Sequence, residues 1–365
     1  MLYVFVNYNY SPGFNSPESW FKRTEGYTGL LECLSKENTV ISIKQINYKG
    51  ICVHNGVQHH FLDLNTQKTY FPLALNRYIK SLNPDIVFVQ GLHQPLQVIQ
   101  LHLLSGKKTK IIAQHHAEIP FVGIKKHIQR MADKYIDAYL FSSKSMGLDW
   151  VNKGNLASPQ KIHEVMEVSS VFYPIEKTTA KLKAGVTADP AFLLVGRLNA
   201  NKDPLNVVKT FLRFADTNPQ ARLYMIYHTD ELLDDINELL AKHRNKNAIT
   251  LVGQLPHNDL LYWYNSADFI ISGSHYEGSG TAVCEAMSCG CVPVVTDIFS
   301  FRMITDNGKC GLLYEAGNET ELLNALMQTQ QMDVTEKRAK CLAYFKSTLS
   351  FEAIARQIAE IANSL

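Results

Sequence analysis

Residues 269–296 read FIISGSHYEGSGTAVCEAMSCGCVPVVT, and this stretch decides the expected fold. A short apolar run, Phe269–Ile271, leads into a loop with Gly278 and Gly280, and a helix-length segment then leads to a second run, Val292–Val295. Uninterrupted apolar runs are typical of parallel strands that are buried on both faces of a sheet. A glycine-rich loop between a strand and a helix favours anion binding, because backbone N–H groups and the helix N-terminus can face a ligand.

The same alternation extends toward both ends of the chain. Further strands are expected at Leu2–Val6, Val40–Ile43, Ile86–Val89, Ile111–Ala113, Ala138–Phe141, Glu164–Val168, Phe192–Val195, Arg222–Ile226 and Ile249–Val252. Helices are expected at Ser19–Leu34, Leu73–Leu82, Gly123–Lys134, Pro204–Phe214, Glu231–Lys242, Leu260–Asn265, Ala282–Ser288 and Glu319–Gln328. Repeated strand–helix units predict an α/β protein with two doubly wound, Rossmann-like domains.

The break between the two series is expected at Tyr173–Pro190, which loses strand character and is interpreted as a linker. The predicted domains are residues 1–172 and 173–345. Residues 346–365 form a C-terminal amphipathic helix that packs back toward the first domain. Ligands of doubly wound sheets bind at the carboxyl ends of the strands, so the loops that follow strands are the expected sites.

Composition limits the class of protein. The chain has 365 residues, of which 46% are apolar and 19% charged, and this is a globular composition. No apolar run approaches the ~20 residues of a membrane span, and the first residues do not resemble a signal peptide. Seven scattered cysteines favour a reducing, cytoplasmic environment. A net charge of +2 argues against a general nucleic-acid binder.

The charge is distributed unevenly. Residues 1–175 contain 18 Lys and Arg against 12 Asp and Glu, whereas residues 176–365 contain 18 against 22. The basic residues concentrate at Lys107, Lys108, Lys110, Lys125, Lys126, Arg130 and Lys134. A solvated helix face explains this pattern, and a surface for anionic lipid or for a phosphate-bearing acceptor is the alternative.

Two loops carry residues suited to a phosphorylated, hydroxyl-rich ligand. After Phe192–Val195, Gly196 lets the backbone turn sharply, and Arg197 and Lys202 supply two cations suited to a diphosphate. In the loop after residues 269–271, Glu277 precedes a helix that begins near Thr281 and Ala282. Glu285 lies about a turn into that helix. Carboxylates accept hydrogen bonds from sugar and ribose hydroxyls, so the two acids are expected to bracket such a ligand.

These motifs resemble those of the retaining glycosyltransferases of family 4. The resemblance rests on R-x4-K at Arg197 and Lys202, on E-x7-E at Glu277 and Glu285, and on EAM-x-CG-x-PVV at residues 285–295. It is dense over residues 192–330 and diffuse over residues 1–170. It implies a GT-B fold, in which two Rossmann-like domains face each other and the second holds a nucleotide-activated sugar.

The resemblance also implies a role for each residue. Arg197 and Lys202 would stabilise the leaving diphosphate, Glu277 would meet the sugar, and Glu285 would bind the ribose. The remaining donor-binding residues would be Gly196, Gly278, Gly280, Thr281 and Ala282. In the first domain, His116 would face the reacting sugar and Gly13 would lie in an acceptor-side loop. The sequence leaves open whether His115 or His116 faces the ligand.

The resemblance implies a hexosyltransferase-type enzyme of the EC 2.4 class that retains the anomeric configuration. The expected donor is a UDP- or GDP-linked sugar, and the expected acceptor is a saccharide or a lipid-linked molecule in surface-glycan biosynthesis. No D-x-D motif is present, so neither a metal nor another cofactor is expected. The expected location is the cytoplasm, with peripheral contact at the inner face of the membrane through the basic first domain.

Other functions remain open. A catalytically weak relative could bind nucleotide sugars as a subunit, although loss of one of the four charged residues would then be expected and all four are present. A nucleotide-sugar epimerase is another alternative, whereas a phosphorylase would need a marked lysine for its cofactor. A dehydrogenase is disfavoured, because no G-x-G-x-x-G follows the first strand.

Overall fold

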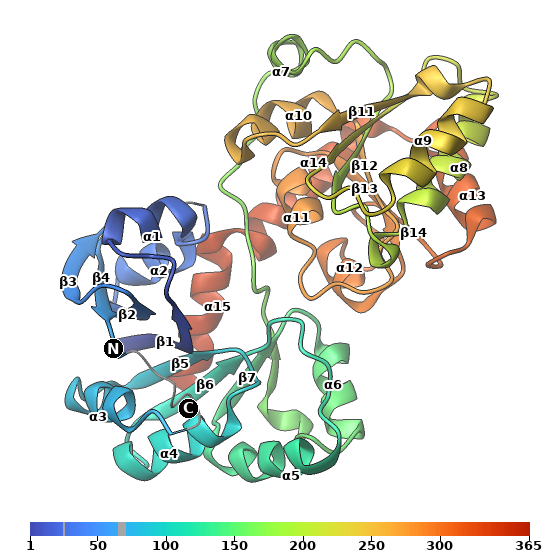
Figure 1. Ribbon diagram of the computed structural model, residues 1–365. Coiled ribbons are helices and arrows are strands. Elements are labelled where there is room, and N and C mark those ends of the chain that lie inside the picture. The colour runs from blue at the N-terminus through green and yellow to red at the C-terminus, as the bar shows by residue number, and fades with distance from the viewer. Residues whose placement is uncertain (25, 65–70) are drawn as a thin grey trace. The chain divides into compact units, whose positions relative to one another are not determined.

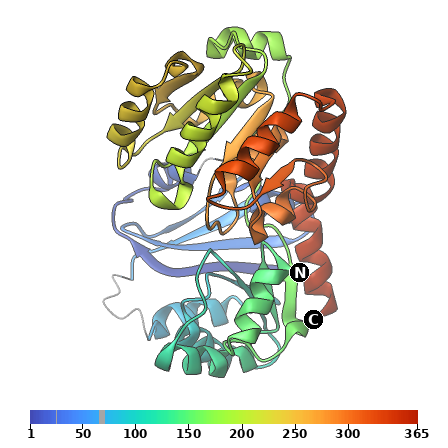
Figure 2. The ribbon, with the colours of Figure 1, turned by 90° about the vertical axis from the view of Figure 1, so that its right-hand side faces the viewer.

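The computed structural model describes residues 1–24, 26–64 and 71–365, and these form two units. Unit 1 comprises Met1–Val168 together with Phe351–Leu365, and unit 2 comprises Ser169–Ser350. Each unit is built on one sheet with helices on its faces (Figures 1 and 2). The prediction of two doubly wound α/β domains is therefore confirmed.

The sheet of unit 1 has eight strands in the order β3-β4-β2-β1-β5-β6-β7-β8, and all pair in parallel except β3 with β4. The strands are β1 (Leu2–Ser11), β2 (Thr39–Ile46), β3 (Gly50–His54), β4 (Val57–Leu62), β5 (Ile86–Gln90), β6 (Lys110–Gln114), β7 (Ala138–Phe141) and β8 (Ile162–Glu164). The helices are α1 (Pro17–Thr24), α2 (Gly29–Ser35), α3 (Leu73–Ser81), α4 (Pro95–Ser105), α5 (Gly123–Ala132), α6 (Lys144–Asn152) and α15 (Phe351–Ser364).

Both faces of this sheet are buried, because successive side chains of a strand point to opposite sides. On one face, Val4 and Val6 belong to a core cluster with residues of α3, α4 and α6. On the other face, the rings of Phe5 and Phe88 stack with their centroids 4.5 Å apart. The helix α15 buries Ile358 and packs beside α2 (Figure 1). The last residues of the chain therefore form part of unit 1.

The sheet of unit 2 has six parallel strands in the order β11-β10-β9-β12-β13-β14. The strands are β9 (Ala191–Gly196), β10 (Arg222–Tyr227), β11 (Ile249–Gly253), β12 (Phe269–Ser272), β13 (Val292–Thr296) and β14 (Leu312–Tyr314). The helices are α7 (Lys177–Ala184), α8 (Pro204–Ala215), α9 (Leu233–Lys242), α10 (Leu260–Ser266), α11 (Thr281–Ser288), α12 (Phe299–Ile304), α13 (Glu319–Thr329) and α14 (Val334–Tyr344).

The strand order of each sheet reverses at one point, and ligands of doubly wound sheets bind there. In unit 2 the chain proceeds from β9 through β10 to β11 on one side and then returns to β12 beside β9. The reversal therefore lies between β9 and β12. In unit 1 the corresponding reversal lies between β1 and β5.

Three local expectations are wrong. The predicted helix Ser19–Leu34 is two helices, α1 and α2, and residue 25 between them lies outside the described chain. The predicted strand Glu164–Val168 ends at Glu164, where β8 ends. The predicted linker contains α7, because the Glu176 carboxylate accepts hydrogen bonds from the first backbone N–H groups of that helix and α7 packs on α10.

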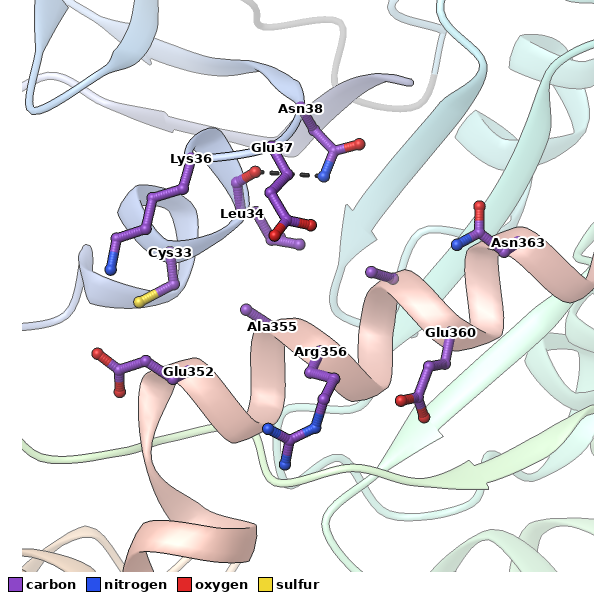
Figure 3. Close-up of a pocket in the computed structure, with 11 residues that line it drawn as sticks. Cys33, Leu34, Lys36, Glu37, Asn38, Glu352, Ala355, Arg356, Glu360 and Asn363 are labelled. Carbon is purple, nitrogen blue, oxygen red and sulfur yellow. Dashed lines mark hydrogen bonds between the residues drawn. The ribbon is translucent and has the colours of Figure 1, made fainter.

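A pocket of ≈ 440 Å³ lies between α2 and α15 in unit 1 (Figure 3). Lys36, Glu37, Glu352 and Arg356 are among the residues that line it. Asn38 also lines it and directly precedes β2, so the pocket lies beside the amino end of that strand rather than at the carboxyl ends, where a sugar site is expected.

Within the described residues, no helix has the length and apolar character required to cross a membrane.

Candidate functional site

The loop after β9 presents Lys202 through a tight local turn. Asn199 accepts a hydrogen bond from the Lys202 backbone N–H at 3.1 Å, which stabilises a 3-10 turn at Ala200–Lys202. Asp203 adopts a left-handed backbone with φ of 45°, and α8 then begins at Pro204. The aliphatic stem of Lys202 lies over Gly196, where an added Cβ would stand 3.7 Å from the lysine Cε. The turn therefore orients Lys202 above the carboxyl end of β9.

The loops after β9 and β12 are held together by hydrogen bonds. The His275 backbone N–H donates to the Asn201 carbonyl at 2.8 Å, and the Asn201 side chain donates to the Tyr276 carbonyl at 2.9 Å. The two backbones approach so closely that a Cβ on Gly273 would lie 3.1 Å from the Lys202 carbonyl oxygen. At the point where the strand order reverses, the loops after β9 and β12 therefore form one continuous, hydrogen-bonded edge, which we call the rim.

Across this rim, Lys202 forms an ion pair with Glu277. Their side chains are 27% and 14% exposed, so both groups are largely removed from water yet remain accessible to a ligand. Opposite charges attract more strongly in such a partly buried environment than at an open surface. An anionic ligand can compete with Glu277 for Lys202, and the released carboxylate can then accept hydrogen bonds from the hydroxyl groups of that ligand.

The N-terminus of α11 opens onto the same loop. Gly280 adopts a left-handed backbone with φ of 61° and provides no side-chain cap. A Cβ at this position would lie 2.7 Å from the Phe301 ring, so only glycine fits. Thr281 and Ala282 follow at the first positions of the helix and are half-buried. Their backbone N–H groups lie at the positive end of the helix, which favours a phosphate group.

Glu285 lies one turn further along α11 and is only 6% exposed. Its two carboxylate oxygens accept separate hydrogen bonds, one from His257 Nε2 at 2.8 Å and the other from the Tyr264 hydroxyl at 2.9 Å. Burial, and then the negative charge of Glu285, raise the pKa of Tyr264 well above its usual value. The tyrosine therefore remains a neutral donor that holds the carboxylate in place.

His257 was not expected from the sequence. It lies in a 3-10 turn, His257–Asp259, shortly after β11, and its ring packs against Phe172 with a centroid distance of 4.9 Å. No local motif marks this histidine, because its contact with Glu285 joins residues that are 28 positions apart. The one indirect signal is its place just after a strand end.

The structure does not bring every expected residue of unit 2 into one cluster. Arg197 is exposed, and no ion pair connects it to another residue in the described parts of the chain. Arg197 belongs to the same loop as Lys202. Next to Arg197, the Leu198 backbone N–H donates a hydrogen bond to the Thr229 hydroxyl at 2.9 Å, which anchors the backbone of this loop. Gly278 is buried between the other loop residues. Lys202 and Glu277 therefore form the paired centre of the site, and Arg197 lies at its margin.

In unit 1, the structure distinguishes the two adjacent histidines. The side chain of His115 is 1% exposed and stacks on Phe141, and its Nε2 donates to the Glu118 carbonyl at 2.7 Å. The side chain of His116 is 32% exposed. His116 is therefore the histidine that a ligand can reach, at the carboxyl end of β6. Gly13 lies on an exposed turn after β1, and a Cβ there would have no described atom within 4 Å.

Two carboxylates that the sequence analysis did not single out surround His116. Glu167 forms an ion pair with His116 Nδ1, and Glu118 accepts a hydrogen bond from the His116 backbone N–H at 2.6 Å. Glu118 also accepts from the Leu92 backbone N–H at 2.8 Å and from His93 Nδ1 at 3.2 Å. Burial opposes ionisation of Glu118, but the hydrogen bonds from these donors outweigh it and lower the pKa of Glu118 to about 2.

Glu167 determines the protonation of His116. Burial alone lowers the pKa of His116, but the hydrogen bond with Glu167 and the negative charge of that residue raise it above the usual value. We expect Glu167→Gln to lower this pKa, which a histidine titration by NMR measures. Because the pKa of His116 is higher in the folded chain than in the unfolded chain, its stabilising contribution is complete below about pH 6.5. That contribution is lost as the pH rises through the folded-state pKa.

The melting temperature of Glu167→Gln should therefore fall below that of the wild type by more at acidic pH than at alkaline pH. Glu164→Gln is the matched control, because Glu164 accepts a backbone hydrogen bond from Lys144 and forms no described contact with His116. A difference in melting temperature that is the same at every pH would contradict this interpretation.

The described residues contain no group of three or more His, Cys, Asp or Glu side chains arranged to hold a metal ion.

Comparison with known proteins finds similarity to glycosyltransferases. Residues 177–347 match the model of the family "Glycosyl transferases group 1". A curated relative from Xanthomonas campestris, a GDP-mannose:cellobiosyl-diphosphopolyprenol alpha-mannosyltransferase, is 26% identical over 157 residues, which cover 42% of this chain and 41% of the relative. Across three curated relatives, the chain spans between 21% and 41% of their length. The family-model match to glycosyltransferases therefore lies in residues 177–347, in the later half of the chain.

Solved structures extend the likeness to the whole chain. Sucrose-phosphate synthase from Thermosynechococcus elongatus aligns with a TM-score of 0.70 and 16% identity, covering 100% of this chain and 98% of that protein. Anabaena HepE in complex with UDP aligns with a TM-score of 0.74 and 12% identity, covering 100% of both chains. Likeness at this level of identity concerns the fold, and it confirms that the chain has the GT-B fold.

Proposed function

We propose that this protein is a glycosyltransferase that moves a sugar from a nucleotide-sugar donor to a saccharide or lipid-linked acceptor. The observation that carries the proposal is the cluster at the reversal point of the unit 2 sheet. There the Lys202–Glu277 ion pair, the uncapped N-terminus of α11 and the buried Glu285 belong to neighbouring strand-end loops and the helix that follows. The combination of a cation, helix-end N–H groups and acids fits a diphosphate that connects two hydroxyl-bearing rings.

The proposed donor site assigns a separate task to each group. Lys202 and Arg197 bind the diphosphate, and the backbone N–H groups at Thr281 and Ala282 bind its distal phosphate. Glu277, released from Lys202, accepts hydrogen bonds from the sugar hydroxyls. Departure of the nucleoside diphosphate places negative charge on phosphate oxygens, and preorganised cations and helix-end N–H groups stabilise that charge. We propose that these groups suffice without a metal ion or another cofactor.

Glu285 is proposed to bind the ribose of the nucleotide. Its carboxylate is already held by His257 and Tyr264, so it enters the complex preorganised. Preorganisation lowers the entropic cost of ordering a side chain when the ligand binds. The UDP bound to the structurally similar HepE supports a uridine diphosphate donor, and the GDP-mannose in the name of the Xanthomonas relative supports a guanosine diphosphate donor.

The proposed reaction retains the anomeric configuration. The bond between the anomeric carbon and the phosphate oxygen breaks, the acceptor oxygen bonds to the same face of that carbon, and the acceptor proton passes to the leaving phosphate. His116 is proposed to act beside the reacting sugar, with Glu167 as its positioning partner. Glu118 serves as an anchor of the surrounding loop rather than a nucleophile, because three donors occupy its oxygens.

The diphosphopolyprenol in the name of the Xanthomonas relative supports a lipid-linked acceptor, and we propose a role in surface-glycan biosynthesis on that basis. We propose that this protein is cytoplasmic and contacts the membrane peripherally.

Donor binding is the first test. We expect the matching nucleoside diphosphate, among UDP, GDP and ADP, to raise the melting temperature of unit 2 by about 5–10 °C at 100 times its dissociation constant. Arg197→Ala should reduce this shift without changing the melting temperature of the free protein, because Arg197 is exposed and forms no described ion pair. Arg222→Ala is a control, since its side chain donates to the Pro219 and Ala221 carbonyls away from the strand-end loops.

The absence of a shift with every nucleotide and every nucleotide sugar would contradict the proposed function. Turnover of the matching nucleotide sugar, followed by NMR of the anomeric proton, distinguishes a transferase from a binding subunit or an epimerase. A product with the inverted configuration would contradict the retaining mechanism alone.

A further inference from the structure

An exposed aliphatic and cationic surface lies beside the candidate acceptor loop of unit 1. It comprises Ile119, Val122 and Ile124 with Arg130, and we call it the α5 surface. The three aliphatic residues occur within six positions and are 71%, 84% and 77% exposed, which is unusual for large apolar side chains so close in sequence. Met131, about two helical turns after Ile124, is also exposed.

The charge around this surface has one sign. Residues 119–132 contain Lys125, Lys126 and Arg130 and no Asp or Glu. The neighbouring helix α4 packs against α5 and adds the exposed Leu103, and Lys107 and Lys108 follow at its end. The flanking acids, Glu118 and Asp133, lie outside the segment, and both carboxylates accept hydrogen bonds from backbone N–H groups.

This combination differs from the face of an ordinary surface helix. The side of α5 that faces the protein is identified by the buried Gln129 and Ala132, whereas Ile124, His127, Arg130 and Met131 lie together on the outer side. Aliphatic side chains exposed among cations are expected where a helix rests in the headgroup region of a bilayer. The aliphatic groups then enter the acyl boundary and the cations meet anionic lipid.

We propose that the α5 surface docks onto a bilayer that contains anionic lipid. The position of the surface connects it to the reaction, because the loop from His116 through Glu118 continues directly into Ile119 and Val122. A bilayer bound at α5 brings a lipid-linked acceptor to the loop that carries His116 (Figure 1 shows α5 beside α4 in unit 1). This link to the acceptor rests on the proposed function, whereas docking itself rests on the exposed residues.

Vesicle co-sedimentation of the full chain tests this proposal. The wild type should sediment with vesicles of phosphatidylcholine and phosphatidylglycerol, remain free with phosphatidylcholine alone, and be released by salt. Arg130→Gln should weaken binding by about fivefold, which corresponds to the loss of one cation. Val122→Ser/Ile124→Ser should weaken it by roughly tenfold or more, because less apolar area enters the bilayer.

The matched control is Leu182→Ser/Lys183→Gln on α7 of unit 2. Leu182 is 82% exposed and Lys183 is also exposed, so the control removes the same kinds of group from another surface. Vesicle binding by the control should equal that of the wild type. All variants should keep the wild-type circular dichroism spectrum and the nucleotide-induced thermal shift, which is measured in unit 2.

The possible outcomes separate the two proposals. Failure of the wild type to bind anionic vesicles at low salt, with the nucleotide shift intact, overturns the docking proposal and leaves the proposed function standing. Vesicle binding that depends on α5, without any nucleotide-induced thermal shift, supports the docking proposal and overturns the proposed function. Displacement from vesicles by free glycerol phosphate would indicate a soluble phosphate site. Self-association that the α5 variants abolish, without vesicle binding, would indicate a second copy as the occupant. Either of these last two results overturns docking to a bilayer.

Discussion

Lys202→Ala is expected to lower kcat by about 10²–10³-fold, which is the typical effect of removing one preorganised group that stabilises transition-state charge. The structure explains why the loss is large, since the ammonium is held by a 3-10 turn, lies over Gly196 and is only 27% exposed. Steady-state kinetics with a saturating donor measure the effect.

The ion pair with Glu277 provides an internal check on this prediction. If Lys202 acted only by neutralising Glu277, the double variant Lys202→Ala/Glu277→Gln would recover the activity that the single lysine variant loses. If Lys202 acts on the diphosphate, as we propose, the double variant should be at least as inactive as Lys202→Ala. Recovery of kcat in the double variant would therefore contradict the proposed role of Lys202.

Lys177→Ala is the matched control, because Lys177 also pairs with a largely buried acid of unit 2. Its partner Asp268 accepts a hydrogen bond from the Ala191 backbone N–H at 2.9 Å, at the amino end of β9 and therefore at the opposite edge of the sheet from Lys202. Lys177→Ala should lower the melting temperature and leave kcat unchanged. A similar loss of kcat in both variants would mean that the effect arises from weakened folding.

The strand–helix order of unit 2 could be predicted from the sequence because its buried strands are uninterrupted apolar runs. The predicted run Phe269–Ile271 lies within β12, and Val292–Val295 lies within β13. The three-residue strand β14 was not predicted, because Leu312–Tyr314 is too short to show a pattern. Apolar runs therefore identify the longer strands of this sheet, including the edge strand β11, and miss a strand of three residues.

The antiparallel pair β3–β4 has a signal in the sequence, an Asn-Gly pair between the two strands. Asn55 and Gly56 connect the two strands, and both adopt positive φ values of 49° and 81°. An Asn-Gly turn with this backbone is a strong indicator of a hairpin, because it matches the twist of the flanking strands. Its presence makes one pair of the otherwise parallel sheet antiparallel.

The parts of the candidate site that could be predicted are those that share a strand-end loop with a motif. Arg197, Lys202, Glu277 and Glu285 are singled out by their places in and after strand-end loops and by the family resemblance, whereas the choice between His115 and His116 required the burial of their side chains. Partners that meet across the fold could not be predicted. Glu167 lies 51 positions from His116, and only the alignment of strands in three dimensions brings their side chains together.

Glu285→Ala is expected to raise the dissociation constant for the matching nucleoside diphosphate by about 100-fold. Hydrogen bonds to a charged group contribute about 1.5–3 kcal/mol each, and the proposed ribose contact would provide two of them. Part of this binding free energy is offset, because the Glu285 carboxylate already accepts hydrogen bonds from His257 and Tyr264. Glu285→Gln retains an oxygen that can accept the Tyr264 hydroxyl and should lose less affinity. Isothermal titration calorimetry measures both variants.

A modified ligand decides whether the lost affinity comes from the ribose. The 2′,3′-dideoxy nucleoside diphosphate lacks the hydroxyls that Glu285 is proposed to accept, so it should bind the wild type about as weakly as the natural nucleotide binds Glu285→Ala. For the Glu285→Ala variant, the natural and dideoxy ligands should bind equally, because the group that distinguishes them has been removed. Glu336→Ala, at an exposed carboxylate on α14 that pairs with Lys340, should preserve the discrimination. Full discrimination by Glu285→Ala would place the ribose elsewhere and leave Glu285 as a buried support for α10 and α11.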